Sequence, residues 1–260
     1  DHTFTPAKSV STLWAVGDEA TRAAVHAAHR AAVEAAVGFL EDRGLFTRTG
    51  TAGCRQVRTR GLIAAAFDHW DSRAGDPNLH THVVVANKVQ EASSGRWLSV
   101  DSRALHHAVV AVSEVYDDLV ADELARRLPV AWGWRHRGPR RSPGFELDGV
   151  DDGLMAEFST RTTQIDEAMT ATVTEFYAAH GRGPNRIEVS RLRQQVTRAT
   201  RPEKHVRPLA DLLAAWRQRA SARTGLSPEE LTERVVRASR CHPVPADALP
   251  GVVIEALARA

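Results

Sequence analysis

The feature that most constrains this chain is a run of β-branched and apolar residues that carries two histidines two positions apart. The segment LHTHVVVAN, residues 79–87, is so continuously apolar that it predicts a strand near the middle of a sheet. Side chains at positions i and i+2 of a strand point to the same face, so His80 and His82 project together. The pair therefore predicts two ligands for one metal ion.

A third histidine, His69, lies upstream across a stretch of turn-forming residues. The segment DSRAGDPN, residues 71–78, favours a tight reversal of the chain. The preceding stretch Leu62–Trp70 is alanine-rich enough for a helix, but an antiparallel hairpin is the more economical arrangement and puts His69 on the same face. Three neutral nitrogen ligands leave coordination positions open and suit zinc, nickel, manganese or iron. Acidic residues nearby are candidates to orient the rings: Asp68, Asp71 and Asp76.

The flanking sequence predicts further strands and helices. Residues Asp1–Thr5 alternate polar and apolar side chains, as a strand does, and a short helix is expected from Ser9 to Ala15. Asp18 is placed to cap a long alanine-rich helix that runs to about Arg43. Residues Gln56–Arg60 are expected to be extended.

Two other sets of potential metal ligands give weaker signals. His26 and His29 are three residues apart on the long predicted helix, but no acidic partner accompanies them, so both are interpreted as core or boundary histidines. Cys54 and Cys241 lie far apart without the CxxC spacing of a zinc site, so neither a disulfide framework nor a cysteine–zinc site is predicted.

Composition limits the classes of protein that the chain can belong to. The 260 residues are 43% hydrophobic and 25% charged, which is ordinary for a globular protein with a substantial core. No apolar run reaches the roughly 20 residues that cross a bilayer, so membrane insertion is not expected and a cytoplasmic location is inferred. The net charge is only +2, but arginines gather in 55–60, 135–141 and 182–207, which suits either solvated helix faces or a nucleic-acid partner.

These signals together predict an α+β fold. A central antiparallel sheet carries the histidine triad and is packed by helices, and a helical C-terminal region follows. The expected division is 1–150 for the sheet with the metal site and 151–260 for the helical part. Within the latter, residues 227–240 and 249–260 are expected to form amphipathic helices.

Two motifs, in order, resemble one enzyme family. The segment FDHWDSRAGDPNLHTHVVVAN resembles the histidine-triad motif of the TrwC/TraI-type, or MobF-class, conjugative relaxases of the HUH endonuclease superfamily. That motif has the form H-x-x-[ST]-R, then P-x-L-H-T-H-x-x-x-x-N. The first residues, DHTFTPAKSVS, resemble the family block D-x-T-F-S-x-P-K-S-V-S, with the proline shifted by one. Weaker likeness, including FSTRTTQI, extends the resemblance to about residue 222.

The resemblance implies roles for particular residues. His69, His80 and His82 would hold a divalent metal ion, magnesium, manganese or zinc, that polarises the scissile DNA phosphate. Asp1 would serve catalysis by accepting the nucleophile's proton or by orienting a metal-bound histidine. Arg73 would contact a DNA phosphate through its permanently charged fork, and Lys8 would also touch the DNA strand.

The family reaction implies partners and a missing group. A tyrosine attacks one phosphodiester of single-stranded plasmid DNA at the transfer origin, so that the strand is nicked site-specifically and later transferred. Tyr116 and Tyr177 both fall in predicted helices, and the nucleophile is expected upstream of Asp1, which makes the chain a fragment. A helicase is expected beyond the C-terminus, since no P-loop motif occurs here, and other conjugation (relaxosome) proteins are possible partners.

Two other functions fit the same residues. Without a tyrosine in reach, the chain would be a catalytically incomplete module that binds single-stranded DNA. Alternatively, it would be an unrelated metal-dependent hydrolase in which the three histidines activate water.

Overall fold

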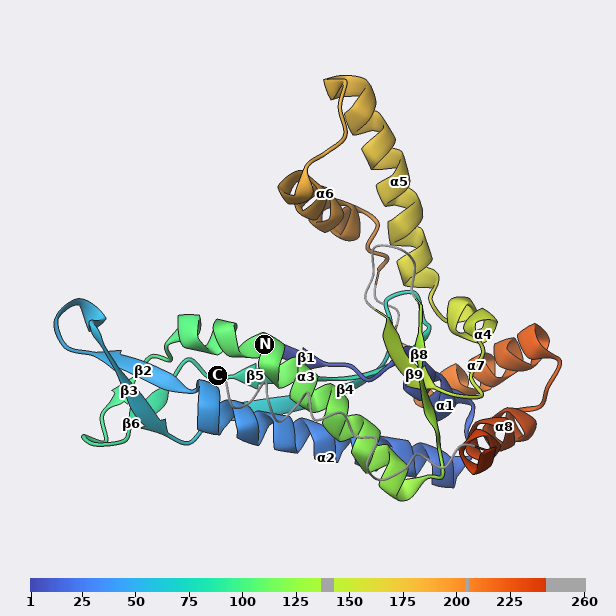
Figure 1. The fold of residues 1–260 in the computed structure, drawn as a ribbon, viewed down its shortest axis with the longest axis horizontal. Helices are drawn as coiled ribbons and strands as arrows, with labels where there is room; N and C mark the ends of the chain where they lie inside the picture. The colour runs from blue at the N-terminus through green and yellow to red at the C-terminus, as the bar shows by residue number, and fades with distance from the viewer. Residues whose placement is uncertain (137–142, 204–205, 242–260) are drawn as a thin grey trace.

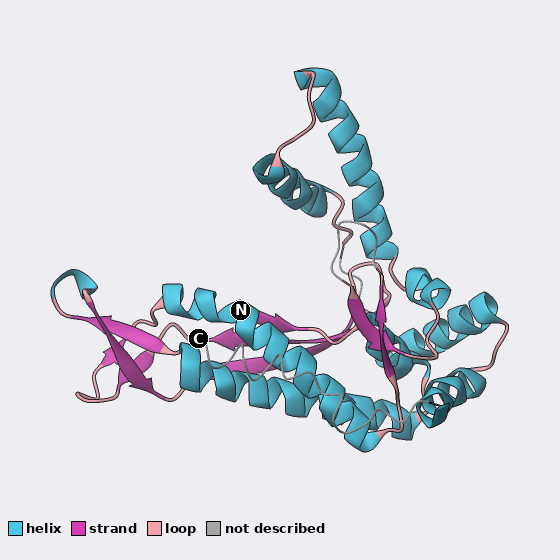
Figure 2. Cartoon of the chain, in the orientation of Figure 1, coloured by secondary structure: helices cyan, strands magenta, loops and turns pink. Residues whose placement is uncertain are grey.

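The computed structural model describes residues 1–136, 143–203 and 206–241, and it places them in a mixed α+β fold (Figures 1 and 2). The strands are β1 (His2–Phe4), β2 (Phe46–Thr49), β3 (Arg55–Arg60), β4 (Ala64–Asp71), β5 (Pro77–Val85), β6 (Val89–Glu91), β7 (Trp97–Leu98), β8 (Trp132–Arg135) and β9 (Gly144–Leu147). The helices are α1 (Lys8–Val16), α2 (Glu19–Gly44), α3 (Ser102–Arg127), α4 (Asp152–Glu157), α5 (Thr160–His180), α6 (Arg186–Ala199), α7 (Leu209–Thr224) and α8 (Pro228–Cys241), with a short 3-10 turn at Thr51–Gly53.

The predicted antiparallel hairpin is formed by β4 and β5, two of the three strands of the histidine-bearing sheet. The strand order of this sheet is β1-β5-β4, so the strand with two histidines is central, as expected. His69 on β4 lies directly opposite His80 on β5, and Thr3 on β1 lies opposite His82. The turn between β4 and β5 is closed by Ser72, whose hydroxyl accepts from the backbone N–H groups of Ala74 and Asp76 at 3.2 Å each. The register thus brings the three histidines together without any long connection.

Helices α2 and α3 cover one face of this sheet (Figure 1). Both begin at an aspartate that accepts a backbone N–H: Asp18 from Thr21 and Asp101 from Ala104. The core beneath them joins the helices to β1 and β5 through buried apolar side chains: Phe4, Ala32, Val33, Ala36, Leu40, Val83, Val112, Tyr116 and Val120. The sheet therefore has one face filled by helices, and the histidines lie on the other.

A second core ties the C-terminal helices to the start of the chain. Trp14 of α1 stacks on Trp70 at a centroid distance of 5.6 Å and also contacts Trp216 of α7. Leu231 and Val235 of α8 join the same core. The helical C-terminal region expected from the sequence is confirmed for the described residues. It packs on α1 through α7 and α8.

Helices α5 and α6 form an arm that projects from the rest of the molecule (Figures 1 and 2). Helix α5 has no buried residue, and in α6 only Val196 is buried. Helix α6 is started by a capping box, in which Asn185 accepts from the N–H of Glu188 and the Glu188 carboxylate accepts from the N–H of Asn185. Local capping, rather than a core, thus specifies where this helix begins.

Of two smaller sheets, the sequence predicted only one strand, the extended segment 56–60, which lies within β3. A four-stranded sheet has the order β2-β3-β6-β7, and a two-stranded sheet pairs β8 with β9. Their strands are two to six residues long, too short for alternation to predict pairing reliably. The expected helix at 249–260 and most of the basic segment 135–141 lie outside the described residues. Within the described part, no helix is both long and apolar enough to cross a membrane.

Candidate metal centre

Three imidazole rings converge on the open face of the β1-β5-β4 sheet. One ring nitrogen from each of His69, His80 and His82 can be chosen so that all three lie within 4.8 Å of one another. The ring centroids are 5.0–5.2 Å apart, and every pair of rings is steeply inclined. Rings that meet edge to face at this spacing can point their lone pairs at a common centre, as three nitrogen ligands of a tetrahedral or larger coordination shell do. Among the described residues this is the group whose geometry could hold a metal ion.

Hydrogen bonds select one tautomer for two of the rings. His80 Nδ1 lies 2.6 Å from the Asn78 carbonyl oxygen, so Nδ1–H donates and Nε2 keeps its lone pair. His82 Nδ1 lies 3.1 and 3.2 Å from the two carboxylate oxygens of Asp1 and 3.1 Å from Thr3 Oγ1. A proton on that Nδ1 can donate to Asp1, which again leaves Nε2 as the free ligand atom. Asp1 therefore stands where a residue that orients a ligand would stand.

The surroundings of His80 favour the neutral ring that a metal needs. Burial lowers the pKa of His80 below its ordinary value, and the neighbouring His69 and His82 lower it further. The hydrogen bond to Asn78 and the charge of Asp71 act in the opposite direction. Since a protonated imidazole has no lone pair to give, the lowered pKa keeps this ligand available at neutral pH.

The expectation that nearby aspartates orient the rings is wrong for Asp68 and Asp76. Asp68 is opposite Thr81 and points to the helix-covered face, where it accepts from Thr81, His26 and Arg30. Asp76 is 1% exposed and accepts from the backbone N–H of Thr160 and from Arg219. Alternation along the strand explains the first case, because Asp68 neighbours His69 and so faces away from it.

The buried Asp76 fixes the turn that carries Arg73. It connects the β4–β5 turn to the start of α5 and to α7, and Trp216 Nε1 donates to the Gly75 carbonyl at 2.7 Å. Arg73 itself is exposed in this anchored turn, between the strands that bear the histidines. A permanently charged guanidinium is thus presented on a turn that α5 and α7 hold in place through Asp76 and Gly75.

Lys8, the other candidate DNA contact, is engaged inside the protein. Its ammonium donates to the Pro77 carbonyl at 2.7 Å. Burial lowers the pKa of Lys8 to about 8, with Arg219 adding to the shift and the charges of Asp76 and Glu146 opposing it. These contacts place its charge at the base of β5, where it supports the strand.

The two histidines of the long helix do not join the triad. His29 is fully buried between Thr81 and Tyr116, which agrees with its interpretation as a core histidine. His26 is a boundary residue, as interpreted, but it has an acidic partner that the sequence did not reveal, Asp68. Cys54 is an exposed free thiol. The buried polar contacts of His29 had no signal in the sequence, because a helix pattern shows which face is buried but not which polar groups meet there.

Neither tyrosine offers a free hydroxyl to the triad. Tyr116 on α3 is 2% exposed, its hydroxyl is hydrogen-bonded to His29, and burial raises its pKa well above the ordinary value. Tyr177 is 60% exposed but lies in the last turn of α5, a helix of the projecting arm (Figure 1). A catalytic phenol at the triad is therefore not supplied by either residue in this arrangement.

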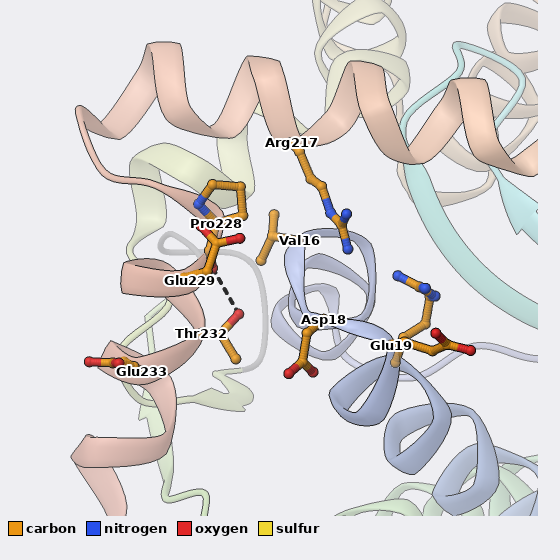
Figure 3. A pocket seen from close by; sticks show the side chains of 9 residues that line it. Val16, Asp18, Glu19, Arg217, Pro228, Glu229, Thr232 and Glu233 are labelled. Atoms are coloured by element: carbon orange, nitrogen blue, oxygen red, sulfur yellow. Dashed lines mark hydrogen bonds between the residues drawn. The ribbon is translucent and has the colours of Figure 1, made fainter.

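A second feature is a hollow at the C-terminal end of α1, away from the end of α1 that contacts β5. It lies where the α1–α2 corner meets α7 and α8, with Arg217 and Asp18 at its centre and Thr232 donating to the Pro228 carbonyl at its wall (Figure 3). Its lining mixes carboxylates with guanidinium groups: Val16, Asp18, Glu19, Arg22, Arg217, Pro228, Glu229, Thr232 and Glu233. No triad residue is among them, so this hollow is separate from the candidate metal centre.

Comparison with known proteins identifies relatives for most of the chain. The model of the TrwC relaxase family matches residues 1–223. The multifunctional conjugation protein TraI of Escherichia coli is 34% identical over 173 residues, and the same-named protein of strain K12 is 31% identical over 175 residues. Each alignment covers 65% of this chain but only 9% of the relative.

Solved structures agree with the sequence comparisons. The conjugative relaxase TrwC in complex with OriT DNA, in a metal-free structure, has a TM-score of 0.69 and 29% identity, covering 87% of this chain and 73% of that one. A copper-bound complex of TrwC with OriT DNA has a TM-score of 0.68 at the same identity, covering 87% and 70%. The fold, the histidine arrangement and the family match over residues 1–223 lead to one conclusion: the chain belongs to the TrwC relaxase family.

Proposed function

We propose that this chain is the metal-binding and DNA-binding part of a conjugative relaxase, which nicks one strand of plasmid DNA at a transfer origin and transfers it. The single observation that carries the proposal is the convergence of His69, His80 and His82 on an open sheet face. An open three-nitrogen site leaves coordination positions for phosphate oxygens. The relative TrwC has been solved both with OriT DNA and in a metal-bound form, which supports a metal site and a DNA partner for this chain.

The donor set favours some metals over others. Three imidazoles suit manganese, zinc, nickel or copper better than magnesium, which prefers oxygen ligands and keeps several waters. A bound divalent ion would act as a Lewis acid on the scissile phosphate. We therefore propose a transition-metal ion as the resident metal, and copper in one TrwC structure is consistent with such a site.

The chain's own residues would orient the ligands and the substrate. Asp1 holds the Nδ1 side of His82, so that Nε2 faces the centre of the triad. Arg73 stands exposed in the anchored β4–β5 turn, where its guanidinium can pair with a phosphate next to the one that reacts. Lys8 would contribute to DNA binding indirectly, by fixing the start of β5 through Pro77.

The attacking tyrosine would come from outside these 260 residues. Tyr116 is buried against His29, and Tyr177 lies on the projecting arm. In the proposed reaction a tyrosine oxygen forms a bond to phosphorus and the bond to the 3′ oxygen breaks. The phenolic proton passes to a base, for which Asp1 is the candidate, and the 3′ oxygen takes up a proton and leaves as a hydroxyl group. A 5′-phosphotyrosyl link keeps the energy of the phosphodiester, so the strand can be rejoined without a nucleotide cofactor.

Charge on the arm and the sheet suits a single-stranded DNA partner. Exposed arginines follow α6 on the arm: Arg186, Arg191, Arg193 and Arg198. Arg193 is paired with Asp166, and the other three are proposed to contact DNA phosphates. Such contacts would make the affinity for DNA fall steeply as the salt concentration is raised. We propose that the arm and the β4–β5 turn contact the DNA backbone.

Further parts of the proposal concern the larger protein. The chain spans about 9% of the length of the curated relatives that it matches, so a C-terminal helicase and binding to other conjugation proteins are proposed by analogy with them. A cytoplasmic location, where plasmid DNA is processed, belongs to the same proposal.

Metal and DNA titrations test the proposed function. Isothermal titration of the chain with Mn²⁺ or Zn²⁺ is expected to give one site, and a fluorescent single-stranded oligonucleotide is expected to bind more tightly than a duplex of the same sequence. Absence of metal binding would refute the metal centre. Metal-dependent hydrolysis of a small phosphodiester by the chain would instead favour a hydrolase that activates water.

A further inference from the structure

A chain of buried polar groups runs behind the histidine triad, on the helix-covered face of the sheet. Thr81, which lies between His80 and His82, is fully buried. Its hydroxyl is 2.7 Å from His29 Nε2 and 2.6 Å from Asp68 Oδ1. The other nitrogen of His29 is 2.7 Å from the Tyr116 hydroxyl. Strand β5 is thus linked to α2, α3 and β4 through a single side chain.

The chemistry of these groups fits one direction of hydrogen bonding. Thr81 has one proton and gives it to the Asp68 carboxylate, so it must accept from His29 Nε2–H. The Nδ1 of a neutral His29 then has a lone pair and accepts from the Tyr116 hydroxyl. Donors and acceptors alternate from Tyr116 to His29, Thr81 and Asp68 without a mismatch. Such a fully satisfied chain holds its members in a defined orientation.

The electrostatics keep this direction fixed. Burial lowers the pKa of His29 to about 4, despite the raising effect of Asp68, so the ring stays neutral at physiological pH. Burial also keeps the Tyr116 hydroxyl protonated by raising its pKa. The series of hydrogen bonds ends at Asp68, on the edge strand β4. His26 and Arg30 also contact the Asp68 carboxylate, at 3.2 and 3.1 Å. Its negative charge is therefore satisfied from both sides.

A threonine is a costly choice at this position unless its hydroxyl has a purpose. Leu79 and Val83, which flank it on the same face, are apolar and are 0% and 3% exposed. A valine of nearly the same shape would bury its surface without requiring two exact partners. Apolar packing alone also tolerates small rotations of the strand, whereas hydrogen bonds of 2.6 and 2.7 Å restrict them.

We propose that Thr81 is a positioning residue for the triad, and that His29 and Tyr116 act through it. Because neighbouring side chains of a strand share one backbone segment, restraining Thr81 on one face restrains His80 and His82 on the other. This inference rests on the proposed function, in that it assigns the metal as the group for which the histidines are held. It adds three residues, on two helices and one strand, that touch neither metal nor substrate.

Substitutions at Thr81 test the proposal with metal as the probe. Thr81→Val removes the hydroxyl and keeps the shape, and Thr81→Ser restores the hydroxyl. Thr47→Val is the matched control, because Thr47 is 1% exposed and donates to the Ser99 carbonyl at 2.7 Å in a different sheet. The dissociation constant for Mn²⁺ alone is measured by titration calorimetry, the absorption spectrum of the Co²⁺-loaded chain reports ligand geometry, and urea unfolding reports stability.

We expect Thr81→Val to bind Mn²⁺ about tenfold more weakly and to change the Co²⁺ spectrum. Thr81→Ser is expected to restore both, and Thr47→Val to lose stability without moving either. Tyr116→Phe, which removes only the far end of the chain of hydrogen bonds, is expected to weaken binding about threefold. If Thr81→Val does not fold, the metal affinity of Tyr116→Phe tests the proposal in its place.

Three results would overturn the proposal. The first is a folded Thr81→Val with the wild-type affinity and spectrum, and the second is a Thr47→Val that weakens Mn²⁺ binding as much as Thr81→Val. The third is wild-type metal binding by Tyr116→Phe in the case where Thr81→Val is unfolded. A wild-type chain that binds no metal would refute the proposed function, and the role of Thr81 with it. The results with the variants would refute only the role of Thr81.

Discussion

The two faces of strand β5 use the same backbone for different purposes. Leu79, Thr81 and Val83 are at most 3% exposed and pack beneath the helices, whereas His80 and His82, which alternate with them, stay partly accessible. One set of side chains supplies core contacts, and the other supplies nitrogen ligands. The difference teaches that stability and chemistry can be changed separately in this sheet, provided that the substituted residue is chosen by face.

The largest expected effect follows from removing two ligands on the open face. We predict that the double variant His80→Ala, His82→Ala loses detectable Mn²⁺ or Zn²⁺ binding, because one remaining imidazole cannot hold the ion. Titration calorimetry measures this. His180→Ala is the control, since His180 ends α5 on the projecting arm, bonds within that helix to the Phe176 carbonyl, and should leave the affinity unchanged. Retained binding in the double variant would mean that the ions occupy a different site.

A substitution on the covered face of β5 should lower the stability of the fold more than a substitution on the open face. Leu79→Ala removes a fully buried side chain and is expected to lower the free energy of unfolding by about 3 kcal/mol through the lost burial and the cavity left behind. Val84→Ala on the open face, where Val84 is 44% exposed, should cost less than about 1 kcal/mol. Urea unfolding compares the two. Equal losses would contradict the assignment of the faces.

Acidic pH should distinguish the buried histidine from the accessible ones. The pKa of His29 is lowered to about 4, so between pH 6.5 and 4 the unfolded chain binds a proton that the folded chain does not. Stability must therefore fall as pH falls through this window, and from pH 7 to 5 this group alone accounts for about 2 kcal/mol. Urea unfolding at the two pH values measures the slope. His29→Gln should reduce that slope, and an unchanged slope would disprove the assignment.

The sequence predicted the parts of the site that depend on spacing along one strand pair. The alternation of His80 and His82 and the turn formers of residues 71–78 were enough to predict the hairpin and the meeting of three rings. The long capped helix after Asp18 was predicted for the same reason, since its signals are local. Local periodicity and turn chemistry carry this information within a few residues.

Contacts between distant segments could not be predicted in that way. The pairings of His29 with Thr81 and with Tyr116 join residues 52 and 87 positions apart, and nothing in a helix pattern identifies such partners. Asp76 illustrates the same limit: its sequence position suggested the triad, but its partners Thr160 and Arg219 lie more than 80 residues away. Of the small sheets, only the segment of β3 was predicted as extended, because the other strands are only two to four residues long.

The smallest effect should come from the edge of the metal centre. The Asp1 carboxylate is 3.1 Å from His82 Nδ1, yet its side chain is 52% exposed, so water competes for the hydrogen bond. Asp1→Asn keeps an acceptor at that position and removes the charge. We therefore expect Mn²⁺ affinity to fall only about threefold, which is less than the roughly 10- to 100-fold loss typical of a residue that orients a ligand. Asp1→Ala should weaken binding further, because Thr3 Oγ1 at 3.1 Å would then be the remaining partner of that nitrogen. An affinity unchanged in both variants would leave Thr3 as the group that sets the His82 tautomer and would restrict any role of Asp1 to the nucleophile's proton.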